Sequence, residues 1–181
     1  MNQALMKKGV ELILQGMIGP SWQKDPNFRE TPSRVARMYI ELLSPQKSHW
    51  ATFPATSADM IVLRGHRLWA LCPHHLAHVE MTAWVAYVPN ELTVGISKLA
   101  RVVDQQLVRP ILQEDLVNDV ADALNEKLRP KGVGVVIKGR HNCMTTRGAK
   151  SDGDIVVSAM RGVLLLNPAA RQEFLSLLGD I

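Results

Sequence analysis

The order of strand-like and helix-like segments is the feature that most restricts the fold of this 181-residue chain. Two segments rich in branched and aromatic residues precede two segments with apolar residues at helical spacing, and two more strand-like segments and a helix follow. Strand pairs on both sides of a helix pair predict an α+β domain, with a mostly antiparallel sheet and helices on one face. In chain order the segments are MIVLRGHRLWALC, VEMTAWVAYVP, SKLARVVDQQLV, QEDLVNDVADALNEKLR, GVGVVIKGRHNCMTTRG, DIVVSAMRGVLLL and PAARQEFLSLLG.

The N-terminal part of the chain has a different pattern. In RETPSRVARMYIELL, Thr31 is the expected N-cap of a helix and Pro32 its first residue. Residues 44–57 mix proline, serine, lysine and histidine without periodicity, which is typical of a loop. We therefore predict a helical extension with a linker over residues 1–57 and a sheet domain over residues 58–181.

Composition narrows the class of protein. Hydrophobic residues make up 46% of the chain, which is enough for a packed core, and no stretch approaches the roughly 20 apolar residues that span a bilayer. The formal charge of +4 favours an anionic partner, but the basic residues form no continuous run and few aromatic residues lie among them. We expect a cytoplasmic protein that binds neither a membrane nor nucleic acid.

The segment LCPHHLAHVE concentrates side chains that bind metals. Cys72 and His75 have a C-x-x-H spacing that can close around one ion, and Cys143 lies two residues after His141 in GRHNC. If that second segment continues as a strand, His141 and Cys143 point to the same side. Two cysteines, one histidine and an open fourth position form an established set for catalytic zinc. The alternatives are a disulfide or two buried, unreactive cysteines, but a histidine near each cysteine favours a metal.

Several motifs together resemble those of the GTP cyclohydrolase I family. They follow the order and near spacing of that family over roughly residues 28–178. The resemblance implies a tunnelling fold, in which each chain contributes a four-stranded antiparallel sheet with two helices on one face. It also implies that the sheets of a pentamer close into a barrel and that two stacked pentamers form a homodecamer. The motifs are ETPSRVARMY, CPHH, VAYVPN, GISKLARVVD, RPILQEDL, HNCMTTRG and PAARQEFLSLL.

The same resemblance implies an activity and the residues that perform it. The reaction is hydrolysis of GTP at C8, which releases formate and forms 7,8-dihydroneopterin triphosphate. Pathways to tetrahydrofolate, biopterin-type cofactors and deazapurines all begin with this step. The implied zinc (Zn²⁺) ligands are Cys72, His75 and Cys143, and the implied catalytic residues are His74, His141 and Ser97.

A further set of residues is implied to bind GTP. Glu114 suits guanine, because an ionised carboxylate accepts hydrogen bonds from N1–H and from the 2-amino group together. Lys98 and Arg101 lie one turn apart at the start of a helix that Ser97 is expected to cap, where free N–H groups also favour a triphosphate. The full set is Gln113, Glu114, Ser97, Lys98, Arg101, Arg147, Arg34 and Arg37, the last two reaching toward a neighbouring subunit's triphosphate.

Two places depart from the family pattern. Pro73 stands where the family usually has an acidic residue. The proline stiffens the ligand loop, and its presence removes a carboxylate beside the metal. Residues 148–158 form a slightly shorter segment with less threonine. These differences keep a second hypothesis open, a weakened homologue that binds zinc and a purine nucleotide without completing the reaction.

Overall fold

The computed structural model describes residues 1–45 and 49–179, and the chain divides into two compact units, Met1–Pro45 and Gln46–Ile181. In the first unit α1 is capped by the side chain of Asn2, which accepts a hydrogen bond from the main-chain N–H of Leu5 at 3.0 Å. Thr31 is the first residue of α2 and not its cap, because the N-cap position falls on Glu30, whose side chain caps no N–H group. The elements of this unit are α1 (Gln3–Ile18), η1 (Pro20–Gln23) and α2 (Thr31–Leu42).

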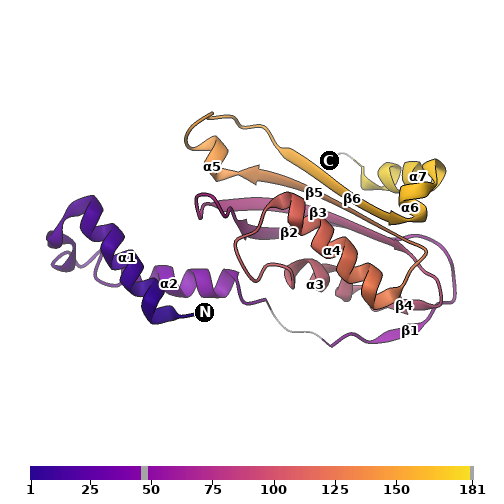
Figure 1. The fold of residues 1–181 in the computed structure, drawn as a ribbon, viewed down its shortest axis with the longest axis horizontal. Helices are drawn as coiled ribbons and strands as arrows, with labels where there is room; N and C mark the ends of the chain where they lie inside the picture. Colours follow the sequence, from indigo (N-terminus) through magenta and orange to yellow (C-terminus); the bar gives the residue numbers. More distant parts are fainter. Residues whose placement is uncertain (46–48, 180–181) are drawn as a thin grey trace. The chain divides into compact units, whose positions relative to one another are not determined.

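The second unit is built on a four-stranded antiparallel sheet with the order β2-β3-β5-β6 (Figure 1). The predicted alternation of strand pairs and helices is confirmed, and the α+β class with it. The strands of this unit are β1 (Thr52–Pro54), β2 (Ile61–Leu71), β3 (His78–Val88), β4 (Leu92–Val94), β5 (Gly132–His141) and β6 (Ile155–Gly162). Its helices are α3 (Ser97–Asp104), α4 (Gln113–Leu128), α5 (Asn142–Thr145), α6 (Val163–Leu166) and α7 (Pro168–Leu178).

The larger core lies between one face of the sheet and the helices α3 and α4 (Figure 1). Side chains alternate along β3, so that Met81, Val85 and Tyr87 face these helices. The opposite face carries a smaller core, in which Trp84 packs with Phe174 of α7. The prediction of helices on one face is therefore correct for α3 and α4, while the C-terminal helices cover part of the other face.

A bulge interrupts the pairing of β2 with β3. The register shifts between Leu63 and His66, and Gly65 within this stretch has a φ of +70°, a conformation that glycine adopts without strain. Just after the bulge, Nε2 of His66 lies 2.8 Å from a carboxylate oxygen of Asp104 at the end of α3. This pair links α3 to β2.

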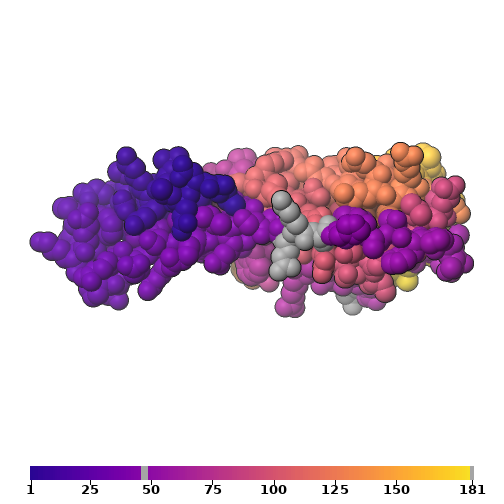
Figure 2. All heavy atoms as spheres, turned by 90° about the horizontal axis from the view of Figure 1, so that it is seen from below, coloured from indigo at the N-terminus to yellow at the C-terminus, as the bar shows by residue number. Residues whose placement is uncertain are grey.

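Two stretches differ from the predicted elements. The 44–57 segment was predicted as a loop, yet β1 lies within it and pairs with β4; residues 46–48 of the segment lie outside the described residues. A three-residue strand is too short to show periodicity, and all of β1 is exposed, at the surface of the second unit (Figure 2, purple). The strand predicted to run through VLLL ends earlier, at Gly162, whose φ of +58° turns the chain into α6.

No helix within residues 1–45 and 49–179 combines the length and the apolar character needed to cross a membrane.

Candidate functional site

Three predicted metal ligands come together at one end of the sheet. Cys72 directly follows β2, His75 lies in the turn between β2 and β3, and Cys143 lies in α5. Their ligand atoms all lie within 4.8 Å of one another. The Sγ atoms of Cys72 and Cys143 are 3.7 Å apart and both thiols are free, and Nδ1 of His75 is 3.9 Å from the Sγ of Cys72.

These distances fit a tetrahedral metal. With bond lengths of about 2.3 Å to sulfur and about 2.0 Å to nitrogen, a tetrahedral zinc ion holds two sulfur ligands about 3.8 Å apart and a sulfur and a nitrogen about 3.6 Å apart. The observed separations of 3.7 Å and 3.9 Å are close to these values. Three protein ligands also leave one position open, as in catalytic zinc sites.

The turn between β2 and β3 is shaped by main-chain hydrogen bonds. The N–H of Cys72 donates to the carbonyl of Ala77 at 2.9 Å, and the N–H of Leu76 donates to the carbonyl of Cys72 at 2.8 Å. Leu76 has a φ of +52°, which is uncommon for a residue with a branched side chain and is enforced by these two bonds. The turn leaves His74 and His75 exposed, with Nδ1 of His74 at 3.7 Å from the Sγ of Cys72.

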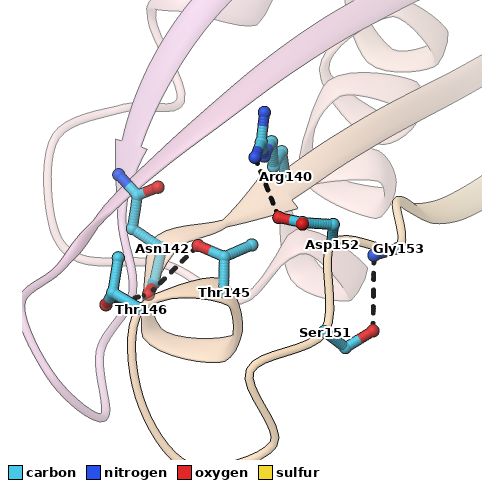
Figure 3. Close-up of polar contacts among 7 residues, drawn as sticks. All are labelled: Arg140, Asn142, Thr145, Thr146, Ser151, Asp152 and Gly153. Atoms are coloured by element: carbon cyan, nitrogen blue, oxygen red, sulfur yellow. Dashed lines mark hydrogen bonds and ion pairs between the residues drawn. The ribbon is translucent and has the colours of Figure 1, made fainter.

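Cys143 does not lie on a strand, and the prediction that it shares one side of a strand with His141 is wrong. β5 ends at His141, and residues 142–145 form the short helix α5. Hydroxyl groups stabilise this turn, because Thr145 and Thr146 both donate to the carbonyl of Asn142, at 3.5 Å and 2.6 Å (Figure 3). The helical turn is what brings the Cys143 thiol toward Cys72.

The surroundings of Cys143 shift the pKa of its thiol in opposite directions. Burial is the main effect that raises the pKa of the Cys143 thiol, and the neighbouring Cys72 raises it further, whereas its own backbone and Arg147 lower it. Arg147 also lies 2.8 Å from Nε2 of His75. A guanidinium group only donates, so Nε2 accepts in this contact. A neutral His75 ring that accepts at Nε2 carries its proton on Nδ1, so it cannot bind a metal through Nδ1 while this contact is present.

The segment between α5 and β6 carries Arg147 and is bonded to β5 and α5. Asp152 reaches Arg140 of β5 at 2.9 Å, and the Ser151 hydroxyl accepts from the N–H of Gly153 at 3.3 Å (Figure 3). The N–H of Ser151 donates to the carbonyl of Met144 in α5 at 3.2 Å. These contacts hold residues 151–153, which lie inside the 148–158 segment that departs from the family pattern.

His141 lies beside the ligand group and contacts the start of α4. Its Nε2 is 2.8 Å from Oε1 of Gln113, the first residue of that helix. Burial lowers the pKa of His141, and the nearby charge of Glu114 raises it by a smaller effect. This contact was not predicted, because the two residues are 28 positions apart; the nearest signal in the sequence is Gly139, which leaves room for Gln113 against the strand.

The other predicted substrate residues lie on separate elements. Ser97 is the first residue of α3 and Ile96 is its N-cap, so the prediction that the Ser97 hydroxyl caps this helix is wrong. Lys98 and Arg101 lie on the same helix. Arg34 and Arg37 both belong to α2 of the first unit. The structure therefore brings the metal ligands together with His74 and Arg147, and it joins His141, two residues before Cys143, to Gln113. It places the remaining basic residues on α2 and α3.

The hollow with the largest volume among those described, about 450 Å³, lies away from this group. It is lined by residues of the β3–β4 turn and the end of α4, including Glu91, Lys127 and Arg129. None of the predicted site residues borders it. Geometry of the ligand group, rather than cavity size, therefore identifies the candidate site.

Comparison with known proteins adds an independent observation. Residues 6–179 match the family model described as GTP cyclohydrolase I. The chain belongs to the GTP cyclohydrolase I family. The match confirms the family that the sequence motifs predict, and it confirms the prediction that the chain is an enzyme of this family.

Curated relatives of this GTP cyclohydrolase I family member cover nearly its full length. The protein named GTP cyclohydrolase 1 from Desulforamulus reducens is 40% identical, over 96% of this chain and 95% of the relative. That of Aquifex aeolicus is 39% identical, over 97% and 96% respectively. The solved structure of the archaeosine synthase QueF-Like in the apo form has a TM-score of 0.50 and 22% identity, and it covers 59% of this chain and 97% of its own. That likeness concerns the fold alone, and it supports the tunnelling fold predicted for the sheet domain.

Proposed function

We propose that this family member is a zinc-dependent GTP cyclohydrolase I, which hydrolyses GTP at C8, releases formate and forms 7,8-dihydroneopterin triphosphate. One observation carries the proposal. In a chain that matches this family over residues 6–179, two thiols and an imidazole from two separate parts of the sequence place their ligand atoms within 4.8 Å of one another. A set with two sulfur ligands favours zinc over the hard cations magnesium and calcium.

The proposed ligands are Cys72, His75 and Cys143. Zinc in a site with an open position makes hydroxide available near neutral pH, which is the chemistry that hydrolysis at C8 requires. Pro73 has no carboxylate to offer, and Arg147 is the charged group that lies against His75. We propose that Arg147 turns from His75 to the triphosphate when His75 binds the metal.

His141 is proposed as the acid that gives a proton to N7 of the purine while water adds at C8. Its half-buried position beside the ligand group supports this role, because a lowered pKa favours release of the proton. His74 is exposed and is proposed to act nearer the ribose. Ser97 is proposed to assist proton movement while the ribose carbons rearrange and the new ring closes.

Glu114 is proposed to select guanine over adenine. It lies exposed in the first turn of α4, next to Gln113, and its charge acts on His141. Adenine presents an acceptor at N1 and lacks the 2-amino group, so a carboxylate there has no pair of donors to bind. Gln113 stays a predicted guanine residue, although both N–H atoms of its amide are already donated to main-chain carbonyls.

The triphosphate is proposed to lie against basic side chains. Lys98 and Arg101 on α3, with Arg147, would neutralise its charge within one chain. Arg34 and Arg37 on α2 are proposed to serve a neighbouring subunit.

The assembly is proposed to be a homodecamer of two stacked pentamers. β2 and β6 form the two edges of the sheet, and pairing of these edges between copies would close the sheets into a barrel and remove unpaired main-chain groups. Light scattering after size-exclusion chromatography tests this. We also propose a cytoplasmic location, because free thiols that serve as metal ligands are typical of a reducing compartment.

The test follows formate and pterin separately in protein whose zinc content has been measured. The parent should release formate from GTP and form a pterin. His141→Ala should release almost no formate, whereas Ser97→Ala should release formate yet make little pterin. His78→Ala, a histidine of β3 outside the proposed machinery, is the matched control and should behave as the parent. A parent that binds zinc and GTP but releases no formate would instead be the weakened homologue.

A further inference from the structure

Among the residues that the structure describes, Gln113 is the polar residue that is buried, with 2% of its surface exposed. Its side-chain Nε2 lies 2.8 Å from the carbonyl of Ile137 on β5 and 3.0 Å from the carbonyl of Ile155 on β6. Its Oε1 lies 2.8 Å from Nε2 of His141. The amide therefore links the start of α4 to two strands and to the histidine beside the metal ligands.

The two carbonyls determine which way the amide points. A main-chain carbonyl can only accept, and the NH₂ group of glutamine supplies two N–H donors, one for each carbonyl. The reversed amide would set its oxygen against two acceptors and lose both bonds. Oε1 must therefore face His141, and since it can only accept, Nε2 of His141 must carry a proton.

This assignment leaves Nδ1 as the working nitrogen of His141. A neutral imidazole has one protonated and one unprotonated nitrogen, so a proton fixed on Nε2 leaves the lone pair on Nδ1. We propose that Gln113 is a positioning residue that locks this tautomer, so that the proton exchanged with the substrate is carried by Nδ1. The tautomer follows from the hydrogen bonds alone, while its use in catalysis rests on the proposed function.

Gly139 provides the space for this arrangement. It lies on β5, two residues before His141, and a Cβ atom at this position would collide with Oε1 of Gln113 and lie 3.3 Å from Nε2 of His141. Because Gln113 is buried and held by both carbonyls, its oxygen cannot move aside without losing its bonds. Gly139→Ala should therefore break the link to His141 while every polar group stays in the chain.

The experiment compares Gln113→Met and Gly139→Ala with the parent, all zinc-loaded. Methionine keeps the length of glutamine but lacks the amide, and the glycine variant keeps the amide but displaces it. Asn118→Leu removes a side-chain amide that α4 holds at its exposed surface, and it serves as the matched control. Each protein is labelled with ¹⁵N-histidine, and the His141 signals are assigned by their loss in His141→Asn.

At a pH where His141 is neutral, the parent and Asn118→Leu should show a protonated Nε2 and an unprotonated Nδ1. Both test variants should show a mixture of tautomers. Formate release should fall by about tenfold to a hundredfold in both, part of the roughly 10²- to 10⁴-fold that a general acid contributes.

A proton on Nδ1 in the parent, or an unchanged tautomer in both variants, would overturn the assignment. A lost tautomer with undiminished formate release would overturn its role in catalysis. If the parent releases no formate although Nε2 is protonated, the proposed function fails while the Gln113–His141 assignment stands, so the two failures are distinguishable.

Discussion

Gly134 of β5 and Phe174 of α7 lie against each other, and the structure allows an estimate of how strongly substitutions at the two positions are coupled in their effect on stability. Phe174 is 0% exposed, and a Cβ atom added to Gly134 of β5 would lie 2.7 Å and 2.9 Å from two atoms of the Phe174 ring and 3.1 Å from a methyl group of Leu164. Carbon atoms normally pack at about 3.5 to 4.0 Å, so the buried ring would have to move by about 1 Å. Gly134→Ala should therefore overpack the smaller core, which typically costs about 1 to 3 kcal/mol.

The second substitution of the cycle removes the ring. Phe174→Ala leaves a cavity on the sheet and should lower the free energy of unfolding by about 3 to 5 kcal/mol. In that background the Cβ of Gly134→Ala no longer meets the ring, and only the Leu164 methyl group at 3.1 Å remains close, so most of the overpacking cost should disappear. The two substitutions should thus be coupled by about 1 to 3 kcal/mol.

Urea unfolding of the parent, both single variants and the double variant measures this coupling. The protomer concentration must be the same in all four, because association contributes to apparent stability. Equal slopes against urea would show that the substitutions change stability and not the denatured state. Additivity within about 0.5 kcal/mol would refute the packing of α7 on β5 described above.

Three further predictions concern the site. Cys143→Ala should lose bound zinc while its circular dichroism stays near that of the parent, and full metal occupancy would contradict the ligand assignment. Burial holds the pKa of His141 below its usual value, so the stability it contributes is present above about pH 6.5 and is lost as the pH falls through its folded pKa. Glu114→Gln should lower this pKa further in an NMR titration, because a charge that raises it is removed, and a rise would refute the stated cause. Asp152→Asn should cost at most about 1 kcal/mol, less at high salt, because the Arg140–Asp152 side chains are 53% and 83% exposed; a loss above about 2 kcal/mol in thermal unfolding would show a larger role.

The sequence predicts the long elements well and the short ones poorly. α4 and β3 carry apolar side chains at regular spacing over many residues, and this pattern follows from which side is buried. β1 has three residues and depends on a partner strand nearly 40 positions later, which no local pattern reveals. The apolar run after Gly162 reads as a strand, but the positive φ of that glycine starts a helical turn instead.

The candidate site shows the same division. Cysteine and histidine spacing predicts the three metal ligands, because the ligand types are rare and chemically specific. The helical turn at Cys143 was missed, because strand-like composition continues past the end of β5. The contact between Gln113 and His141 joins two elements whose relative position arises only when the sheet and α4 pack.

The extra residue of the bulge in β2 sets the phase of the strand that follows it. Before the bulge, odd-numbered side chains such as Leu63 pack toward α3 and α4; after it, even-numbered ones such as Leu68 do, and Cys72 belongs to this even series. If the same residues paired regularly, without the bulge, each later side chain would move to the opposite face and Cys72 would turn away from Cys143. A metal ligand thus owes its direction to a bulge that lies seven positions earlier in the chain, and a homologous chain without the extra residue would align correctly around the ligand only with a one-residue gap at this place.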